Sequence, residues 1–146
     1  EAGGVVGHTD MLAALRSLGD EFVERSGIRL TLEAPTMLPE VTARAELAVF
    51  RAMQEALANV ARHSGARHVR VSVMPNGDRL SLEVEDDGRG LPAGFQVEAG
   101  EREGHLGLAG MRERMSALQG EFAIRAAAAS GTLVRVSVPL NSGVAS

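Results

Sequence analysis

The sequence predicts an α+β protein in which helices lie on one face of a mostly antiparallel, mixed sheet. Segments with an apolar residue every three or four positions, as in amphipathic helices, are interleaved with segments that alternate apolar and polar residues, as in strands. Most strand segments come as pairs joined by short turns, which favours hairpins and antiparallel pairing. The order helix, strand, helix, hairpin, helix, hairpin is typical of a two-layer α/β sandwich with one core.

Three segments carry the helical pattern. The first helix is expected to begin at Thr9, an N-cap residue type, and to end at Gly27 as its C′ residue. The second covers about 41–63, and the third starts near 108 and is closed by Gly120. Their apolar faces are formed by Met11, Leu12, Leu15, Leu18 and Phe22, by Phe50, Met53, Leu57 and Val60, and by Leu108, Met111, Met115 and Leu118.

Five segments carry the strand pattern. Residues 28–32 form a single strand, whereas 69–73 and 80–84 form a hairpin around a turn at 75–78. A last hairpin joins 122–124 to 134–138 through a turn near Ser130 and Gly131. From Gly88 to Gly107 the chain is rich in glycine and has neither period, which predicts a loop.

The composition fits one soluble domain, 1–146, with flexible tails at 1–8 and 141–146. Hydrophobic residues make up 45% of the chain, enough for a core. No segment has the roughly 18–20 consecutive apolar residues that span a bilayer, and a signal peptide is not expected from the first residues. The absence of cysteine rules out disulfides and, with these features, suits a cytoplasmic domain.

The charge pattern narrows the classes of ligand. A net charge of −4 and the absence of Tyr and Trp argue against nucleic-acid binding, which needs clustered positive charge and often stacking rings. All 15 basic residues are arginine. The chain therefore lacks the lysine of a Walker P-loop or of a protein-kinase phosphate site.

An acidic residue at a strand end is the first candidate binding group. Asp86 has the same parity as Leu80, Leu82 and Val84, so its side chain is expected to face the core. A buried carboxylate needs a donor, and either the protein or a ligand such as an adenine amino group can provide one. Gly88 would let backbone approach a ligand closely, but an ordinary Asp-Gly turn explains the same stretch.

The second helix carries a polar face. Glu55, Asn59 and His63 recur every four residues with Arg62 beside them, which places them on one side of a helix. A carboxylate and an amide oxygen one turn apart suit Mg²⁺, and the two basic residues suit phosphate oxygens. A solvated helix face is the plain alternative.

Glycines at 104, 107 and 110 lead into the third helix. The N-terminal amides of that helix would favour an anion. A dinucleotide fingerprint is excluded because such a fingerprint follows a strand directly, whereas a long loop precedes this one. We interpret the segment as a phosphate-covering lid, with a surface loop as the alternative.

Together these blocks resemble the catalytic, nucleotide-binding domain of bacterial sensor histidine kinases, within the ATPase superfamily of gyrase, Hsp90, histidine kinases and MutL. The segment QEALANVARH (54–63) looks like the N box, DDGRG (86–90) matches the G1 box, GHLGLAGMRERM (104–115) looks like the G2 box, and SGT (130–132) the last box. The Gly-Met-Arg-Glu-Arg run and the segment LAALRSLGDEFVERSGIRL are similar to kinases that serve response regulators with LuxR-type DNA-binding outputs.

The resemblance implies a Bergerat-type fold that uses ATP and Mg²⁺. Asn59 would coordinate Mg²⁺, Asp86 would bind the adenine amino group, and Glu55 would orient or activate a water or the acceptor. The full set of expected ATP contacts is Asn59, Arg62, His63, Asp86, Gly88, Gly90, Gly107, Leu108, Gly110 and Thr132.

The resemblance also implies partners. The γ-phosphoryl group would pass to a histidine on a helical dimerisation domain, which this chain is expected to lack, and from there to the response regulator. His8 is interpreted as a tail residue, and the lid has only Phe95 as an aromatic anchor. Two alternatives stay open: an anti-sigma-factor serine kinase of the same superfamily, and a non-catalytic nucleotide-binding module that docks through an exposed apolar first helix.

Overall fold

The computed structural model describes residues 3–90 and 107–140. The elements are α1 (Gly3–Ser26), β1 (Arg29–Glu33), α2 (Ala43–Asn59), the π-helical turn η1 (Val60–Ser64), β2 (His68–Asn76), β3 (Arg79–Asp86), α4 (Leu108–Ala117), β4 (Glu121–Ala126) and β5 (Thr132–Pro139). No described helix combines the length and apolar character that a membrane crossing requires.

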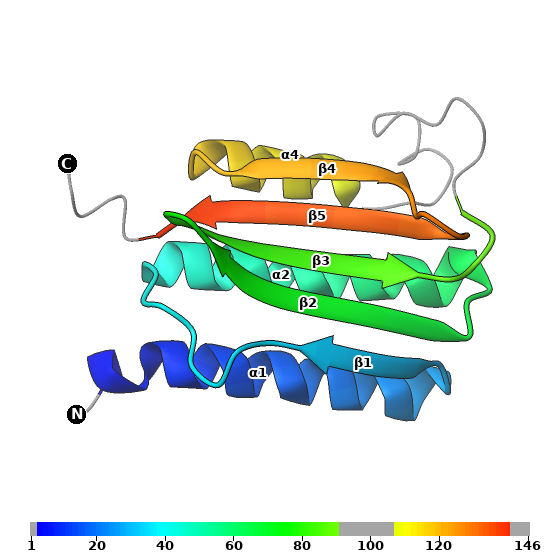
Figure 1. Cartoon of the computed structure of the whole chain (residues 1–146), viewed down its shortest axis with the longest axis horizontal. Helices are drawn as coiled ribbons and strands as arrows, with labels where there is room; N and C mark the ends of the chain where they lie inside the picture. Colours follow the sequence, from blue (N-terminus) through cyan, green and yellow to red (C-terminus); the bar gives the residue numbers. More distant parts are fainter. Residues whose placement is uncertain (1–2, 91–106, 141–146) are drawn as a thin grey trace.

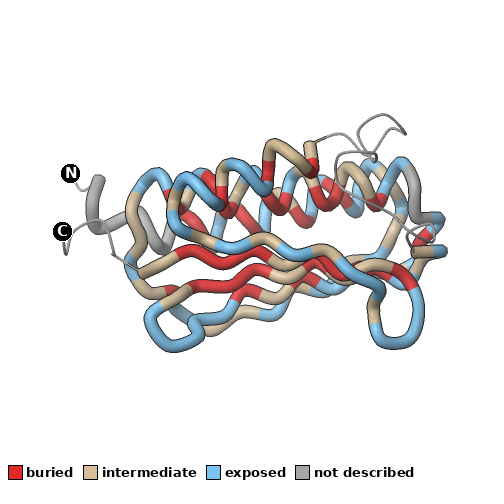
Figure 2. Tube along the Cα trace, turned by 90° about the horizontal axis from the view of Figure 1, so that it is seen from above, coloured by how far each residue is buried: buried red, intermediate tan, exposed pale blue. Residues whose placement is uncertain are grey.

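The strands form one sheet in the order β1-β2-β3-β5-β4. Only β1 and β2 run parallel, and the other neighbours are antiparallel. The helices α1, α2 and α4 lie side by side on one face of this sheet (Figure 1), and the view from above shows them as a second layer (Figure 2). The predicted two-layer α+β sandwich is confirmed.

The core fills the space between the two layers. Leu80, Leu82 and Val84 point into it as their parity predicted, each at most 2% exposed. Across the sheet, Leu82 faces Val73 on one side and Val136 on the other, so apolar residues line up on the covered face. Figure 2 shows the buried residues gathered between helices and strands.

The first helix begins earlier than predicted. It starts at Gly3, so Thr9 lies inside it and the N-cap prediction is wrong. A cap is worth at most about 2 kcal/mol, which does not oblige a helix to begin there. The other end is as predicted: Gly27 has φ 74° and its N–H donates to the carbonyl of Val23.

The apolar face of α1 is not an exposed docking surface, as one alternative required. Met11, Leu15 and Phe22 are buried in the core shared with α2. The expected tail at 1–8 overlaps the start of α1, and residues 141–146 lie outside the described residues.

The second helix is shorter than predicted and changes form. Its N-cap is Thr42, whose hydroxyl oxygen accepts a hydrogen bond from the Ala45 N–H at 3.1 Å. After Asn59 the chain widens into η1, and Gly65 ends it in the left-handed conformation. A π-turn holds more residues than an α-turn. The α-helical spacing that placed Arg62 and His63 on the same side as Glu55 and Asn59 therefore does not apply beyond Asn59.

The third helix ends in a Schellman motif rather than at a left-handed glycine. Gln119 takes the left-handed conformation, with φ 60°, while the N–H of Gly120 donates to the Met115 carbonyl at 2.7 Å. A side chain at Gly120 would overlap the Ser137 carbonyl. Glycine is therefore needed at 120 for a close approach to β5.

Candidate functional site

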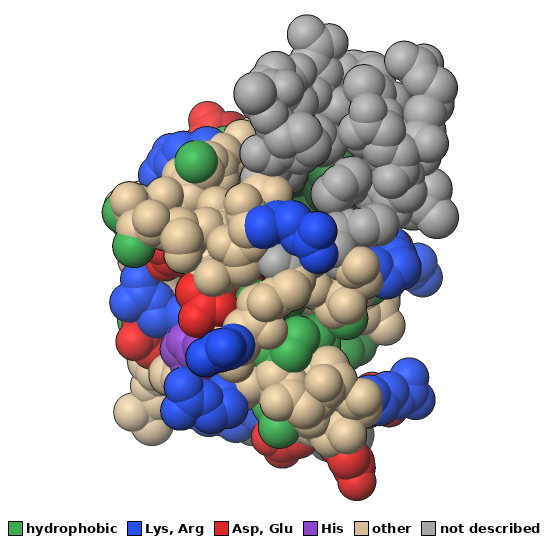
Figure 3. Space-filling model, turned by 90° about the vertical axis from the view of Figure 1, so that its right-hand side faces the viewer, with side chains coloured by type: hydrophobic (Ala, Val, Ile, Leu, Met, Phe, Trp, Pro, Cys, Tyr) green, Lys and Arg blue, Asp and Glu red, His purple; other side chains and the backbone are tan. Residues whose placement is uncertain are grey.

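The four sequence blocks meet at one end of the sandwich. The C-terminal end of β3, the turn between β4 and β5, the start of α4 and the end of α2 with η1 all lie at the right-hand end in Figure 1. Figure 3 looks at that end and shows several arginine side chains spread over it among acidic ones. Arg62, Arg67 and Arg89 are exposed. The fold thus gathers residues that are far apart in the sequence.

Asp86 is the last residue of β3 and is buried, with 5% of its surface exposed. The protein supplies donors to it: Oδ1 accepts the Gly88 N–H at 2.8 Å, and the Thr132 backbone adds a second hydrogen bond. Burial still outweighs these bonds and raises the pKa of Asp86 above its ordinary value. Because a carboxylate has about four acceptor positions, Asp86 retains capacity for a further donor.

Glycines enclose this carboxylate. Gly131 has φ 90°, and a Cβ there would overlap the Asp86 carbonyl and lie 2.8 Å from its Oδ1. Gly90 has φ 81°, and its Cβ would lie 3.2 Å from the Gly131 carbonyl. The SGT turn therefore packs directly on the DDGRG segment. Gly131 was not among the predicted site residues, although its place in the quoted SGT block was a signal.

The neighbouring Asp87 has a structural role that the sequence reading missed. Its Oδ1 accepts the backbone N–H groups of Arg67 at 2.9 Å and His68 at 3.1 Å. The Ser130 hydroxyl donates to its carbonyl at 3.3 Å. The Arg67 hydrogen bond, followed by that of His68, lowers the pKa of Asp87. Asp87 thus ties three segments together beside Asp86.

Asn59 is the last residue of α2 and has an incompletely paired amide. Its Nδ2 is buried and has no hydrogen-bond partner among the described residues. Among the described residues its Oδ1 accepts a long bond, 3.4 Å, from the exposed Arg62. An orphaned buried amide costs about 1–3 kcal/mol, so a ligand that supplied the missing acceptor would be favoured here.

Glu55 and Gly107 connect α2 with the start of α4. Gly107 is the N-cap of α4, with φ 91°, and a Cβ on it would overlap the Glu55 carboxylate. The sequence had assigned both residues to the site without placing them in contact. A carboxylate beside a helix N-terminus is also favoured by the helix dipole.

The remaining predicted residues occupy different environments. Leu108 is 2% exposed and belongs to the core, so only its backbone is available to a ligand. Gly110 lies within the first turn of α4, and Thr132 is the first residue of β5. Gly104, His105 and Phe95 lie outside the described residues, as does the side chain of His63.

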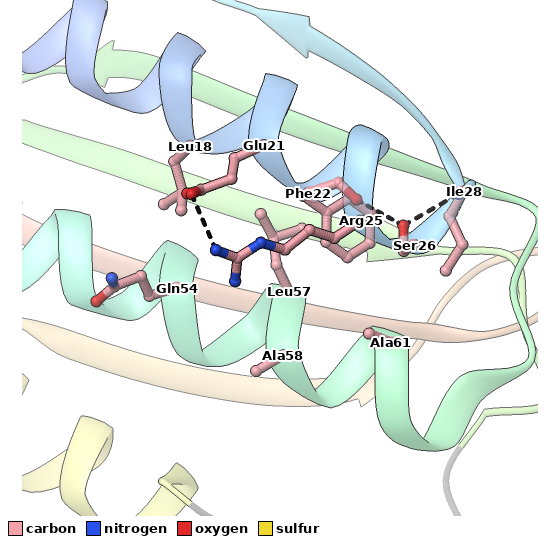
Figure 4. Close-up of a pocket in the computed structure, with 10 residues that line it drawn as sticks. All are labelled: Leu18, Glu21, Phe22, Arg25, Ser26, Ile28, Gln54, Leu57, Ala58 and Ala61. Atoms are coloured by element: carbon pink, nitrogen blue, oxygen red, sulfur yellow. Dashed lines mark hydrogen bonds and ion pairs between the residues drawn. The ribbon is translucent and has the colours of Figure 1, made fainter.

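A separate hollow of about 500 Å³ lies between α1 and α2 (Figure 4). Its floor includes Phe22 and Leu57, and Glu21 and Arg25 form an exposed ion pair on its rim. None of the predicted site residues lines it. This hollow is therefore a different region from the one that holds the Asp86 carboxylate, the Asn59 amide and the glycines. The functional argument rests on that second region, because its residues have the chemistry of a binding site.

Comparisons with known proteins give the family and the fold. A family model described as histidine kinase-, DNA gyrase B- and HSP90-like ATPase covers residues 44–142. The histidine-protein kinase/phosphatase DegS of Brevibacillus brevis is 30% identical over 132 residues, which are 90% of this chain and 33% of DegS. The histidine-protein kinase/phosphatase UhpB of Salmonella typhimurium is 38% identical over 127 residues, which are 86% of this chain and 24% of UhpB.

Solved structures agree on the fold. The histidine kinase domain of the Erythrobacter litoralis EL346 blue-light activated kinase superposes with a TM-score of 0.73 at 23% identity, over 90% of this chain and 62% of that one. The ATP binding domain of PrrB from Mycobacterium tuberculosis gives 0.67 at 23% identity, over 88% and 92%. The chain spans a third or less of the two curated relatives named above.

Proposed function

Because the chain belongs to the family of histidine kinase-, DNA gyrase B- and HSP90-like ATPases, we propose that it is the ATP-binding catalytic domain of a sensor histidine kinase. In this proposal it donates the γ-phosphoryl group of ATP to a histidine on a separate dimerisation domain. The phosphoryl group then passes to a response regulator, of the LuxR-type output class. The domain covers residues 1–146 and works in the cytoplasm.

Asp86 is the proposed adenine receptor. The buried carboxylate is already fixed by the Gly88 N–H and retains acceptor capacity for the amino group of the base. Gly90 and Gly131 approach each other beside it without side chains, and Thr132 follows at the start of β5. Backbone can therefore contact a flat ring closely at this end of the sheet.

The phosphates are proposed to lie toward α2 and α4. Arg62 is exposed, and within residues 3–90 and 107–140 its side chain is held by the long bond to Asn59, so it can turn toward a phosphate oxygen. The first N–H groups of α4, from Leu108 to Gly110, are available as further donors. His63 completes the proposed set.

Asn59 is the proposed Mg²⁺ ligand. Its Oδ1, weakly held by the 3.4 Å bond from Arg62, fits a metal that takes one or two protein oxygens and otherwise keeps waters and phosphates. The unpaired Nδ2 is a donor and would instead meet a phosphate oxygen. When bound, Mg²⁺ would neutralise phosphate charge during transfer. Glu55, held against Gly107, is proposed to orient the incoming acceptor.

Transfer itself requires little covalent chemistry from the protein. The imidazole nitrogen of the acceptor forms a bond to the γ-phosphorus as the bond to the β–γ bridging oxygen breaks, and ADP leaves. Catalysis of such a step comes mainly from positioning and from stabilised charge. The observation that carries the proposal is the meeting of Glu55, Asn59, Asp86 and the glycines at one end of the fold.

Thermal unfolding with nucleotides tests the binding half of the proposal. ATP and ADP are added with Mg²⁺ or with chelator to the wild type, to Asp86→Asn and to Asp78→Asn. Asp78 is an exposed acid in the β2–β3 turn, so its variant is a matched control. A ligand at 100 times its Kd stabilises the folded state by about 2.7 kcal/mol.

A Mg²⁺-enhanced shift in the wild type and in Asp78→Asn that disappears in Asp86→Asn supports the proposal. The same shift in all three proteins would remove Asp86 from the site. No shift with any nucleotide would reject the ATP-binding assignment.

The transfer half is tested by adding a dimerisation domain with labelled ATP. Acid-labile phosphate on its histidine is the expected product. Acid-stable phosphate on a serine of a partner would instead favour an anti-sigma-factor kinase. Tight ATP binding without any transfer would favour a non-catalytic nucleotide-binding module.

A further inference from the structure

A second concave surface lies between α2 and α4, away from the nucleotide end. It has a volume of about 270 Å³ and includes Arg44, Leu47, Ala48 and Arg51 from α2 and Arg114 and Leu118 from α4. Arg44, Leu47, Ala48 and Arg51 recur at three- and four-residue intervals, so they form one stripe of α2. We call this surface the arginine groove.

The arginine groove lies well away from Asn59. Arg51 precedes Asn59 by eight residues and Leu47 by twelve, which at 1.5 Å per residue gives roughly 12 and 18 Å along the helix axis. In Figure 1 the first turns of α2 and the end of α4 lie at the left, opposite the end where β3 finishes. None of the proposed nucleotide contacts lines it. Arg114 alone extends toward that end, because its Nη1 lies 3.6 Å from where a Cβ on Gly110 would be.

Its charges are unbalanced. Three guanidinium groups surround it, and no ion pair joins any of them to a carboxylate within the ranges 3–90 and 107–140. By contrast, Arg70 and Arg135 on the sheet pair with Glu85 and Glu83 at 2.9 and 3.3 Å. A carboxylate entering the groove would therefore find guanidinium groups that are free to pair with it.

Arg114 gives a second, independent indication of an anionic ligand. Its Nε is buried and lacks a hydrogen-bond partner in the described part of the chain. An N–H of a cationic group that is shielded from water without an acceptor is unfavourable. An oxygen from a bound molecule would supply the missing acceptor.

The arginine groove also contains apolar residues, which indicate that its ligand has an apolar part. Leu47 is 52% exposed, one of the few large hydrophobic side chains so exposed in the described residues. Ala48, the next residue in the chain, is buried, and Leu118 on α4 is half-buried. A small anion would leave this apolar surface in water, whereas a bulky apolar side chain would cover it.

We propose that the arginine groove is the docking site for an acidic segment of a partner protein, which inserts one bulky apolar side chain and pairs its carboxylates with Arg44, Arg51 and Arg114. Arginine forks match carboxylates in a bidentate geometry. A concave surface receives a protruding side chain, and a lipid surface is tested as a separate occupant because Leu47 is itself exposed. Apolar anchors on a helix or extended chain that enter such grooves are a common mode of peptide recognition.

The test uses the whole chain and a synthetic helical peptide with one central leucine flanked on both sides by glutamates. Binding is followed by fluorescence anisotropy of the labelled peptide and by amide chemical shifts of the protein. The comparison peptides replace the glutamates by glutamine or the leucine by asparagine. Vesicles containing phosphatidylserine form a further arm.

The variants are Arg44→Gln with Arg51→Gln, and Leu47→Asn. Arg125→Gln is the matched control, because Arg125 is exposed on β4 in the other layer. We expect the double variant to weaken peptide binding by about tenfold, as two partly exposed ion pairs would. Leu47→Asn should also weaken it, and added salt should weaken binding to the wild type.

Several results would overturn the proposal. These are the absence of saturable binding of the acidic peptide, an equal loss in Arg125→Gln, and equal binding of the glutamine peptide. Binding of vesicles without binding of the peptide would assign the groove to a lipid surface instead. Because the readout needs no nucleotide, failure here is separable from failure of the ATP-binding proposal.

Discussion

The backbone of Gly107 lies directly against the carboxylate of Glu55, in a contact that leaves no space for a Cβ. The contact joins the middle of α2 to the N-terminus of α4. It also explains why a glycine precedes α4, since Gly107 has a left-handed φ of 91°. A change at either Glu55 or Gly107, both predicted site residues, is therefore expected to affect the other.

Gly107→Ala should therefore destabilise the protein and displace Glu55. The left-handed backbone alone costs a residue with a Cβ about 1–2 kcal/mol, and the overlap adds to that cost until Glu55 moves. Urea unfolding of Gly107→Ala, Glu55→Ala and the double variant measures the coupling. The double variant should lose less than the sum of the single losses, because Glu55→Ala removes the overlap but not the backbone strain. Strict additivity would show that the contact does not exist in solution.

Asp87 should make the protein sensitive to acid. Its folded pKa is lowered, mainly by the Arg67 N–H and next by the His68 N–H, so the ionised form stabilises the fold. That stabilisation is present above the ordinary aspartate pKa, about 3.9, and is lost as the pH falls through the lower folded value. Asp87→Asn should unfold at a lower urea concentration than the wild type at neutral pH, and the difference should shrink in acid.

Asp78→Asn is the control, because Asp78 is exposed at the opposite end of β3. It should match the wild type over the whole pH range. A deficit of Asp87→Asn that stays constant with pH would mean that the carboxylate charge does not contribute.

Local patterns were sufficient to predict some of these features and not others. Alternation along β3 was enough to predict that Asp86 faces inward, because side-chain parity depends only on the strand. The packing of Gly131 on Asp86 was not predictable in the same way, since it depends on β5 lying beside β3. The role of Asp87 was missed for the same reason: its partners Arg67 and His68 begin another strand.

Some helix ends could likewise be predicted from nearby residues, whereas others depend on contacts with distant ones. Thr42 is an N-cap residue type directly before Ala43, so a closer reading of the sequence would have placed the start of α2 there. The π-turn after Asn59 has no comparable local signal. At the end of α4, Gly120 was predicted to close the helix, but the reason for a glycine there is the nearby Ser137 carbonyl of β5, which the local sequence does not reveal.

Gln119→Gly should stabilise the protein. Gln119 has φ 60°, a conformation that costs a non-glycine residue about 1–2 kcal/mol. Glycine removes this cost. It also raises the conformational entropy of the unfolded chain, which lowers the free energy of unfolding by about 0.4–1 kcal/mol. The net gain should therefore lie between zero and about 1.6 kcal/mol, seen as a higher midpoint in urea. Gly120→Ala is the opposing control and should be destabilising; a gain in Gly120→Ala would contradict the observed close approach.

Asp86→Asn should separate stability from nucleotide binding. Burial, the largest influence, raises the folded pKa of Asp86, so the folded state prefers the protonated carboxyl. The contribution of this group to stability is therefore fully present below the ordinary aspartate pKa, about 3.9, and is lost as the pH rises through the raised folded value. Asparagine has nearly the same shape, does not titrate, and can still accept the Gly88 N–H.

At neutral pH the apo form of Asp86→Asn should be at least as stable as the wild type, and the two should converge in acid. The same variant should lose the nucleotide shift, because an amide is a weaker acceptor for the adenine amino group. Urea midpoints between pH 3 and pH 8, with and without ATP, measure both effects. A variant that is less stable than the wild type at neutral pH would show that ionised Asp86 holds the fold together. The buried carboxylate would then be explained by its role in the fold, and its burial would no longer indicate a ligand.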